Sequence, residues 1–343
     1  MSSIDIIVPC YGYGRYLEQC VGSLLRQEVP ALRVLIIDDA SPDDTAVVGQ
    51  RLADADSRVS FRRHVKNMGH IATYNEGVEW ASSEYLLLLS ADDYLLDGAL
   101  PRAVDLMDAN PTMALCYGNA LEGYPDGTFR SCGTGFDLES TDESLVLDST
   151  QFLESFRVSG SKNTVPTPTA VVRTRVQKAL GGYRVELPHT ADLEQWLSLA
   201  AHGPVGVIAN NQAVYRRHAN NMSLGYSGEH KLIDLIQRQA AISSFCRSNR
   251  ELLPNAEQLQ KRLIEPLAFD AIGSASDAFN RGAHSLVAQL TAYAEKVHPG
   301  VKRSLPWLLL AAKKGMGTRL SRALLPALGT VRTVARKCFG TAA

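Results

Sequence analysis

The stretch Glu84–Asp93, EYLLLLSADD, decides the fold that we predict for this chain. Four consecutive leucines, Leu86–Leu89, stand between polar residues, so the apolar run has the length of a β-strand and no polar face. Such a run is typical of a central strand that is buried on both faces of a parallel sheet. Asp92 and Asp93 follow directly, and two carboxylates at the end of a buried strand are costly unless a cation meets them. Because ligands of open α/β sheets bind at this edge, we expect a divalent metal carrying a phosphorylated ligand here.

Strands and helices alternate along the first part of the chain. We predict strands at residues 4–9, 34–37, 58–63, 85–89 and 113–117, and helices at residues 16–26, 71–81 and 97–110. Strand, helix and strand at this spacing indicate right-handed crossovers and a mostly parallel sheet flanked by helices. The predicted fold class is therefore α/β, with a Rossmann-like sheet.

Three local patterns give more specific expectations. Ser41 and Pro42 are typical of a helix start, with serine as the cap and proline in the first helical position. Residues 119–165 are rich in Gly, Ser and Asp, so we expect loops there, apart from a short helix near Thr150–Arg157. Residues 166–173 contain two prolines, which favours a strand at the edge of the sheet.

The length of the chain, 343 residues, is enough for two domains of ordinary size. After Gly228 the pattern becomes helical, with few strand signals. We therefore place a boundary near residue 225, which gives an α/β domain at residues 1–225 and a helical C-terminal region at residues 226–343. The apolar content of 45% and the charged content of 21% are ordinary for a soluble globular protein.

Positive charge is concentrated at the C-terminus. The net charge is −1, which gives no reason to expect a nucleic-acid partner. Residues 301–343 contain nine Lys or Arg and no Asp or Glu, so this segment carries +9 and the rest of the chain −10. Apolar patches alternate with the basic residues, and such a segment can lie in the headgroup region of an anionic membrane. The alternative is a helical cap that packs on the first domain and exposes a basic face.

The cysteines and the N-terminus indicate a cytoplasmic protein. The six cysteines are scattered without a CxxC pair, which favours reduced thiols over a disulfide framework or a zinc site. The first residues lack the basic region and apolar core of a signal peptide. The chain also lacks a run of about 18 apolar residues, which a membrane-spanning helix needs. We expect a cytoplasmic location, with the basic segment able to hold the protein on the inner face of the cytoplasmic membrane.

Acidic residues at strand ends and at a helix start suggest the chemistry. Asp39 closes the second predicted strand, at the same edge as Asp92 and Asp93. Clustered carboxylates suit Mg²⁺ or Mn²⁺, and such a metal on a diphosphate would stabilise a departing nucleoside diphosphate. A separate carboxylate must take a proton from the incoming nucleophile, and Asp192, far along the chain, is the candidate. The simpler alternatives are a helix cap for Asp39 and a first-turn acid for Asp192.

Other candidate residues also have simpler explanations. His218 by itself is most simply a surface histidine or one that is satisfied by hydrogen bonds, and Asn67 and Gly69 are most simply turn residues. No Walker A, GxGxxG, GxSxG or HExxH motif occurs in the sequence.

Taken together, the motifs resemble the family 2 glycosyltransferases, which have the GT-A fold. The similar segments follow the family's order from about residue 4 to residue 223. They are Ile6–Tyr11 (IIVPCY), Leu35–Thr45 (LIIDDASPDDT), Asn67–Gly77, Ser90–Asp93 (SADD), Gly181–Tyr183, Ala191–Trp196 and Tyr215–Ser223.

The resemblance implies a binding site for a nucleotide sugar. Pro9, Tyr11 and Asp39 would line the nucleoside pocket, with Asp39 on the base. Asn67 would belong to the same donor site, and Asp92 would hold the ribose.

The resemblance also implies a metal and a catalytic base. Asp93 would coordinate Mn²⁺ or Mg²⁺ on the diphosphate, and His218 would be a further metal or phosphate contact. Asp192 would deprotonate a hydroxyl of a glycan or lipid-linked acceptor, which attacks in line with the leaving diphosphate and inverts the anomeric centre. The implied enzyme transfers a hexosyl or N-acetylhexosaminyl group in surface polysaccharide or lipopolysaccharide biosynthesis.

The sequence departs from the family pattern at three positions and leaves two alternatives open. Ser90, Ala191 and Tyr74 stand where the family usually has Asp, Glu and Arg. The departures at Ser90 and Ala191 would suit a catalytically inactive scaffold that binds glycans or a membrane. A nucleotidyltransferase is the other alternative, and it needs a Gly-rich GxGxR-like loop, of which Tyr11–Arg15 (YGYGR) is only a partial match.

Overall fold

A computed structural model describes residues 2–136 and 144–317. The chain divides into two compact units, which are described separately. The first unit consists of Met1–Leu224 and Gln237–Leu263, and the second of Gly225–Ile236 and Ile264–Ala343. Because residues 237–263 group with the first unit, the domain boundary at residue 225 stays a prediction.

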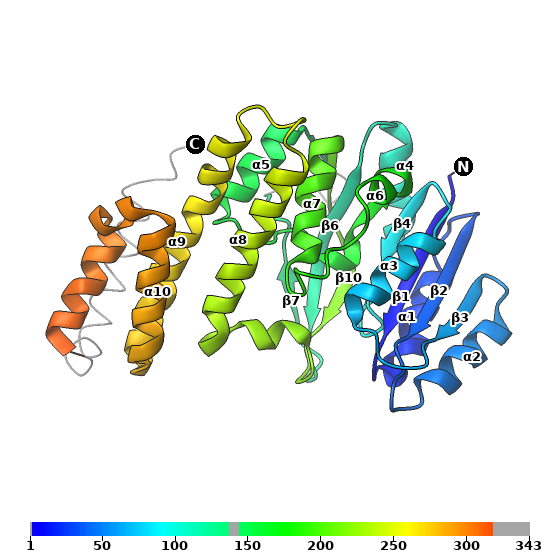
Figure 1. Cartoon of the computed structure of the whole chain (residues 1–343). Helices are drawn as coiled ribbons and strands as arrows, with labels where there is room; N and C mark the ends of the chain where they lie inside the picture. The colour runs from blue at the N-terminus through cyan, green and yellow to red at the C-terminus, as the bar shows by residue number, and fades with distance from the viewer. Residues whose placement is uncertain (1, 137–143, 318–343) are drawn as a thin grey trace. The chain divides into compact units, whose positions relative to one another are not determined.

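The first unit is built on one sheet with the strand order β3-β2-β1-β4-β9-β6-β10-β5, to which β7 and β8 are added beside β6 and β10 (Figure 1). The strands are β1 Ile4–Cys10, β2 Leu32–Asp38, β3 Val59–Arg63, β4 Tyr85–Leu88, β5 Tyr94–Leu95, β6 Leu115–Gly123, β7 Phe129–Cys132, β8 Ser144–Leu147, β9 Val171–Arg173 and β10 Val205–Arg216. Strands β1 to β4 run parallel, and β6 is parallel to β10. The mostly parallel α/β sheet predicted from the sequence is confirmed.

Helices connect these strands and pack on the sheet, for example α3 on β1 and α4 on β6 and β10. In the first unit they are α1 Gly14–Leu25, α2 Thr45–Ala55, α3 His70–Trp80, α4 Ala99–Ala109, α5 Ser149–Val158, α6 Thr174–Ala179 and α7 Ala191–His202, with the 3₁₀ turn η1 Thr167–Thr169. Further along the chain are η2 Met222–Tyr226, η3 Gly228–His230, α8 Lys231–Ser248, α9 Ala256–Arg281, α10 His284–Val297 and η4 Pro299–Arg303.

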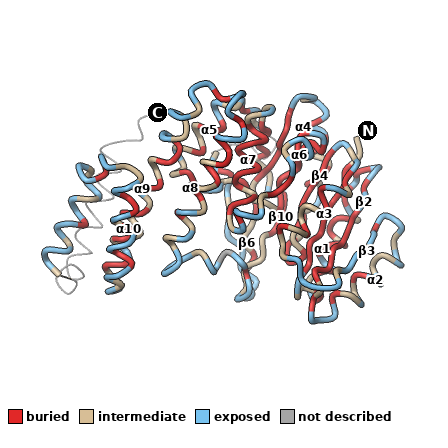
Figure 2. The backbone as a smooth tube through the Cα atoms, in the orientation of Figure 1, coloured by how far each residue is buried: buried red, intermediate tan, exposed pale blue. Residues whose placement is uncertain are grey.

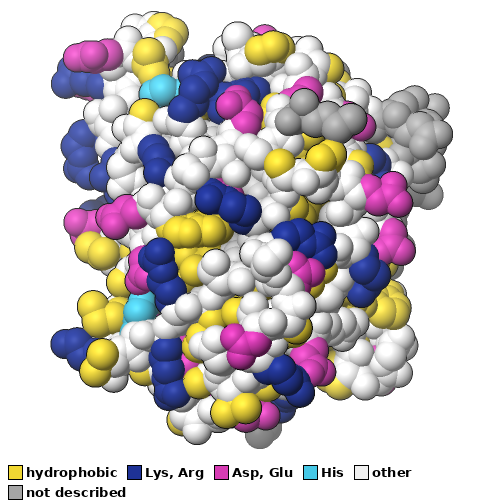
Figure 3. Space-filling view, turned by 90° about the vertical axis from the view of Figure 1, so that its right-hand side faces the viewer, with side chains coloured by type: hydrophobic (Ala, Val, Ile, Leu, Met, Phe, Trp, Pro, Cys, Tyr) yellow, Lys and Arg dark blue, Asp and Glu magenta, His cyan; other side chains and the backbone are white. Residues whose placement is uncertain are grey.

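The core of the first unit lies around the central strands (Figure 2). Every residue of β1 and of β4 is buried, and for β4 the leucine run predicted this. Helix α3 approaches this core closely at Gly77, where an added Cβ would lie 2.4 Å from Cγ2 of Ile7. On the face of the molecule shown in Figure 3, Lys and Arg side chains lie among Asp and Glu side chains, as expected for a net charge of −1.

The predicted helix start at Ser41 is wrong. Helix α2 begins at Thr45, and its N-cap residue Asp44 makes no side-chain cap. Ser41 instead lies in the turn after β2, where its Oγ accepts a hydrogen bond from the backbone N–H of Gly12 at 2.9 Å. The Ser-Pro pattern is typical of a helix start, but here the Ser41 hydroxyl binds the loop after β1 and does not cap α2.

Two further expectations need correction. The short strand β9 is not at the edge, because it pairs antiparallel with β4 on one side and β6 on the other. Its two preceding prolines cause no conflict, since they lie before the strand, at η1, where no ladder N–H is needed. The described residues between 119 and 165, which are 119–136 and 144–165, are also less irregular than expected, because they continue β6 and form β7, β8 and α5. The predicted helix near Thr150–Arg157 is confirmed as α5.

The described part of the second unit is helical. Helix α10 buries Leu286, Val287 and Leu290, and residues 305–317 form a further helical segment. The helical C-terminal region is thus confirmed as far as residue 317, and residues 318–343 of the predicted basic segment lie outside the described residues. Among residues 2–136 and 144–317, no helix is long and apolar enough to cross a membrane.

Candidate active site

The carboxyl ends of the parallel strands bring distant loops to one edge of the sheet. The loop after β1 is tied to the loop after β2 where Gly14 N–H donates to Oδ2 of Asp43 at 3.0 Å. It is tied to the residues after β4 where Ala91 N–H donates to the carbonyl oxygen of Pro9 at 3.2 Å. The same edge receives the end of β10, since β10 runs in the direction of β6. This edge is where ligands of open α/β sheets bind.

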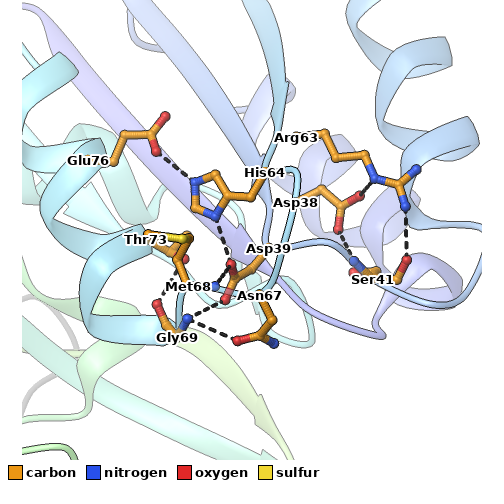
Figure 4. A network of polar contacts seen from close by, with 10 residues as sticks. All are labelled: Asp38, Asp39, Ser41, Arg63, His64, Asn67, Met68, Gly69, Thr73 and Glu76. Carbon is orange, nitrogen blue, oxygen red and sulfur yellow. Dashed lines mark hydrogen bonds and ion pairs between the residues drawn. The ribbon is translucent and has the colours of Figure 1, made fainter.

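Asp39 lies at this edge and holds the turn that follows β3 (Figure 4). Its Oδ1 accepts a hydrogen bond from Met68 N–H at 2.6 Å, and its Oδ2 accepts one from Gly69 N–H at 2.9 Å. Gly69 has φ of +84°, a conformation that favours glycine. The Oδ1 of Asn67 also accepts from Gly69 N–H, at 3.0 Å. Asp39 and Asn67, both predicted as donor-binding residues, are therefore joined in one turn.

A histidine that the sequence analysis missed joins this network. The Nδ1 of His64 lies 2.7 Å from Oδ1 of Asp39, and its Nε2 lies 2.7 Å from Oε2 of Glu76 on α3. Burial lowers the pKa of His64, but its hydrogen bonds to the two carboxylates outweigh this and leave the pKa raised. The only signal for His64 in the sequence is its place directly after the third strand.

The two carboxylates after β4 are both buried. Asp92 is 6% exposed and Asp93 is 2% exposed. Burial raises the pKa of both, and the charge of Asp92 raises the pKa of Asp93 further. The end of β10 partly compensates, because Arg216 N–H donates to Oδ1 of Asp93 at 2.9 Å and Arg216 Nη1 donates to the carbonyl oxygen of Asp92 at 2.5 Å. Arg216 is a second residue whose contacts the sequence did not predict.

His218 meets Asp92 and not Asp93 directly. Its Nε2 lies 3.0 Å from Oδ2 of Asp92. Its Nδ1 accepts a hydrogen bond from Asn220 N–H at 3.2 Å, so the proton of the neutral ring belongs on Nε2, where it can donate to Asp92. The ring stacks on Tyr16, with centroids 5.5 Å apart and planes at 24°. The sequence-predicted metal contact is therefore at the site, with both ring nitrogens engaged in this structure.

Asp192 lies in the first turn of α7, as predicted. Its Oδ2 accepts hydrogen bonds from Asn163 Nδ2 at 2.9 Å and from Thr167 Oγ1 at 3.0 Å, and its Oδ1 accepts one from Leu193 N–H at 2.7 Å. Burial nevertheless raises the pKa of Asp192. The carboxylate is thus fixed in position and is a stronger base than an exposed aspartate.

Tyr74 on α3 lies among the acidic groups of the site. Burial and the charges of Asp192, Asp92 and Asp93 all raise the pKa of its phenol, while a hydrogen bond with Ser90 lowers it. The Tyr74 ring makes an edge contact with Tyr183, with centroids 5.4 Å apart. Two positions that depart from the family pattern, 74 and 90, are therefore neighbours, and they lie near both the Asp92–Asp93 pair and Asp192.

The two remaining predicted residues, Pro9 and Tyr11, lie at the carboxyl end of β1. Pro9 is buried in β1, where it lies opposite Ile37 of β2 in the register of the sheet. Tyr11 follows β1 and is 50% exposed, so its ring is available to a ligand at this edge.

Comparison with known proteins agrees with this architecture. Residues 5–159 match the family model described as "Glycosyl transferase family 2". Residues 5–159 belong to glycosyl transferase family 2. A GalNAc(5)-diNAcBac-PP-undecaprenol beta-1,3-glucosyltransferase of Campylobacter jejuni is 31% identical over 169 residues, which are 48% of this chain and 54% of that protein. A chondroitin synthase of Escherichia coli is 26% identical over 223 residues, 64% of this chain and 30% of that protein.

The proteins similar to this chain thus include ones named for glycolipid and polysaccharide synthesis, and this chain spans about half of their length or less. Among solved structures, TarS of S. aureus in complex with UDP-GlcNAc has a TM-score of 0.55 and 15% identity, covering 87% of this chain and 91% of that chain. The mannosyltransferase PcManGT of Pyrobaculum calidifontis, in complex with GDP-Man and Mn²⁺, has a TM-score of 0.50 and 16% identity, covering 91% and 86%. These likenesses show the fold.

The donor atoms at this edge of the sheet are of kinds that divalent cations bind. Asp92 and Asp93 provide carboxylate oxygens, which Mn²⁺ and Mg²⁺ both accept, and His218 provides an imidazole nitrogen, which Mn²⁺ accepts more readily than Mg²⁺. In the described part of the chain, no hydrogen bond from another residue reaches Oδ2 of Asp93. Within the same residues, no group of three or more His, Cys, Asp or Glu side chains is arranged to hold a metal.

Proposed function

We propose that this family 2 glycosyltransferase moves a sugar from a nucleoside diphosphate donor to a hydroxyl group of a glycan or glycolipid, with inversion and with a divalent metal. The observation that carries this proposal is the meeting of Asp39, the Asp92–Asp93 pair and His218 at one sheet edge. Asp192 supplies a separate, partly buried carboxylate held by two side chains.

The donor would lie along the strand ends, from Asp39 to Asp93. Oδ2 of Asp39 has one partner among the described residues, Gly69 N–H, and can accept one more hydrogen bond, from an N–H of a nucleobase. Tyr11, which follows β1, offers an exposed ring at the same edge of the sheet. Asp92, whose Oδ2 contacts His218, would accept hydrogen bonds from the hydroxyl groups of a ribose. This arrangement supports the donor-binding roles of Pro9, Tyr11, Asp39, Asn67 and Asp92.

Asp93 and His218 would hold the metal, with diphosphate and water oxygens as the other ligands. When bound, the metal supplies positive charge to the departing diphosphate. The protein contributes by keeping the carboxylate of Asp93 in a fixed orientation through Arg216 N–H. For His218 to ligate through Nε2, its hydrogen bond to Asp92 must be given up.

Asp192 would act as the general base. Asn163 and Thr167 fix its Oδ2, and burial raises its pKa, which favours proton uptake from an attacking hydroxyl. With one base and no covalent intermediate, a single in-line displacement inverts the anomeric centre. Transfer of a hexosyl or N-acetylhexosaminyl group is the form of this reaction that we propose.

We also propose that the acceptor is lipid-linked and that the C-terminal segment contacts an anionic membrane on its cytoplasmic side. The relative from Campylobacter jejuni is named for an undecaprenol-linked substrate, which supports an acceptor in surface glycan synthesis. In the helical segment 305–317, Leu305, Leu308 and Leu309 are exposed beside the basic residues Lys302 and Arg303. Apolar side chains exposed next to basic ones are typical of interfacial helices.

The test is release of nucleoside diphosphate from a panel of UDP- and GDP-sugars, with Mn²⁺ and with EDTA. The expected result is metal-dependent release from at least one donor, increased by a lipid-linked glycan acceptor. Release of pyrophosphate from a nucleoside triphosphate would instead favour a nucleotidyltransferase. If no common donor is turned over, the proposed transfer is wrong, and an inactive scaffold becomes the better account.

A further inference from the structure

The ring of His64, a residue given no role above, lies between two carboxylates (Figure 4). The Nδ1 lies 2.7 Å from Oδ1 of Asp39 and the Nε2 lies 2.7 Å from Oε2 of Glu76. The side chain of His64 is 13% exposed. An ionised carboxylate can only accept hydrogen bonds, so both contacts are satisfied together only when both ring nitrogens carry a proton.

The charged groups around this ring favour the imidazolium. Asp39 faces it from the end of β2 and Glu76 faces it from α3, and these two acids outweigh the effect of burial on its pKa. On β3, the strand that precedes His64, Arg62 contacts Glu76 at 3.2 Å, on the oxygen that His64 does not use. The ring is thus a cation held between a carboxylate at the site and a carboxylate on a helix.

This cation restrains the orientation of Asp39. Oδ1 of Asp39 accepts from both His64 and Met68 N–H, whereas Oδ2 accepts only from Gly69 N–H among the described residues. Rotation of the carboxylate would break the contact with His64 as well as those with the turn. Oδ2 of Asp39, which can accept a further hydrogen bond, therefore keeps one direction, because Oδ1 is linked through His64 to Glu76 on α3.

We propose that protonated His64 is a positioning residue for donor binding, which holds Asp39 and the turn at residues 67–69 in the orientation that meets the nucleobase. The inference rests on the proposed function, in which Asp39 contacts the base. When His64 loses a proton, one of its ring nitrogens presents a lone pair to a carboxylate, and the hydrogen bond between them is lost. The restraint on the orientation of Asp39 then weakens. Nucleotide affinity therefore falls as the pH rises through the pKa of His64.

The experiment measures binding of UDP and GDP by titration calorimetry between pH 5.5 and 9, on the full chain. His64→Leu should bind the preferred nucleotide about tenfold more weakly at pH 6, the effect of losing one hydrogen bond to a charged group. Glu76→Gln removes one of the two acids that raise the pKa of His64, so the fall in affinity should move to lower pH. Glu79→Gln, which removes an exposed acid from the same helix α3, is the matched control.

The outcomes separate this inference from the proposed function. If the wild-type protein binds neither nucleotide, the proposed function is wrong and this inference falls with it. If the wild-type protein binds a nucleotide but His64→Leu binds it equally well, or if Glu76→Gln leaves the pH profile unchanged, the positioning role alone is wrong. Unfolding temperatures without nucleotide identify a variant that fails to fold. If His64→Leu fails to fold, the pH dependence of nucleotide affinity in Glu76→Gln decides whether His64 has the positioning role. A donor KM that rises in His64→Leu while kcat is kept supports the role.

Discussion

The Nε2 of His218 lies 3.0 Å from Oδ2 of Asp92, although the two residues are 126 positions apart in the chain. This contact joins the end of the central strand β4 to the segment that follows β10. Because Nδ1 of the same ring accepts from Asn220 N–H, the neutral ring donates its Nε2 proton to Asp92. One of the two buried carboxylates is thereby held as a hydrogen-bond acceptor, and Asp93 is left as the better candidate for the metal.

Substitution of Asp93 tests this division directly. Asp93→Ala should abolish metal-dependent release of nucleoside diphosphate, because it removes the carboxylate whose Oδ2 is directed to no other described residue. The measurement is product release across a Mn²⁺ titration. Asp97→Ala, an exposed aspartate four residues further along, is the control and should behave like the wild-type protein. Normal metal dependence in Asp93→Ala would assign the metal elsewhere.

Substitution of Asp192 separates chemistry from donor binding. Asp192→Asn keeps the size of the side chain and loses the base, so transfer to an acceptor should fall by about 10²- to 10⁴-fold while nucleotide affinity is kept. Since burial raises the pKa of Asp192, wild-type transfer should decline as the pH falls through that raised value, because the base becomes protonated. Both are measured in an acceptor-dependent transfer assay. Near-native transfer by Asp192→Asn would rule out this base.

Tyr74 tests the departures from the family pattern. Tyr74→Phe removes a hydroxyl that shares a hydrogen bond with Ser90 among the carboxylates of the site. We expect the donor KM to rise about tenfold, the effect of one hydrogen bond, with a changed ranking in a panel of donor sugars. Tyr85→Phe is the control, since its hydroxyl contacts Asp108 at the opposite end of β4. If the KM values and the ranking of the donor sugars are unchanged, the Tyr74 hydroxyl does not contact the donor.

The sequence was sufficient for the sheet and for the acids at its edge. A run such as Leu86–Leu89 predicts a buried strand because burial on both faces leaves no polar positions. The strand ends then place Asp39 and Asp92 at one edge, because parallel strands share their direction. Both inferences depend on local pattern and on the general geometry of α/β folds.

The partners of these acids were not predictable in the same way. His64, Asn163 and Thr167 are ordinary polar residues in their local sequence, and their roles come from contacts with Asp39 and Asp192 across 25 to 29 positions. Ser41 shows the converse error, because a pattern typical of a helix cap serves a hydrogen bond between two loops. A local pattern does not state which distant group a polar atom will meet.

The stability of the first unit should depend on Asp5, at the amino end of the sheet. Asp5 is fully buried, and it accepts hydrogen bonds from Arg33 at 2.8 and 2.7 Å and from the backbone N–H groups of Ser82 at 2.6 Å and Ser83 at 2.9 Å. Burial raises the pKa of Asp5, but these contacts outweigh it and leave the pKa lowered. Asp5→Asn should lower the free energy of unfolding by about 2 kcal/mol at pH 7, measured with urea.

The pH dependence of that difference follows from the lowered pKa. A carboxylate with a lowered pKa stabilises the folded state above its unfolded pKa, near 3.9, and the stabilisation is lost as the pH falls through the folded value. The advantage of the wild-type protein over Asp5→Asn should therefore shrink below about pH 4. A difference that stays constant down to pH 3 would show that the charge of Asp5 does not contribute.

Membrane contact is tested on the helical segment 305–317. We expect the full chain to bind anionic vesicles and to be released when residues 301–343 are removed, but Val301 is buried and Leu310 packs inward, so a deletion also disturbs the second unit. A sharper variant changes three exposed leucines together, Leu305→Ser, Leu308→Ser and Leu309→Ser, and keeps Leu310.

The triple variant should lose binding to vesicles that contain anionic lipid, because insertion of apolar side chains and attraction of the basic residues act together at such a surface. The control is Ala311→Ser with Ala312→Ser, two exposed positions on the same segment that add polarity without removing a large apolar side chain. Cosedimentation with vesicles of pure zwitterionic lipid, compared with anionic vesicles, measures how much of the binding depends on lipid charge. If the wild-type protein and the triple variant bind anionic vesicles equally, the exposed leucines face another partner, and the acceptor must reach the site without this contact.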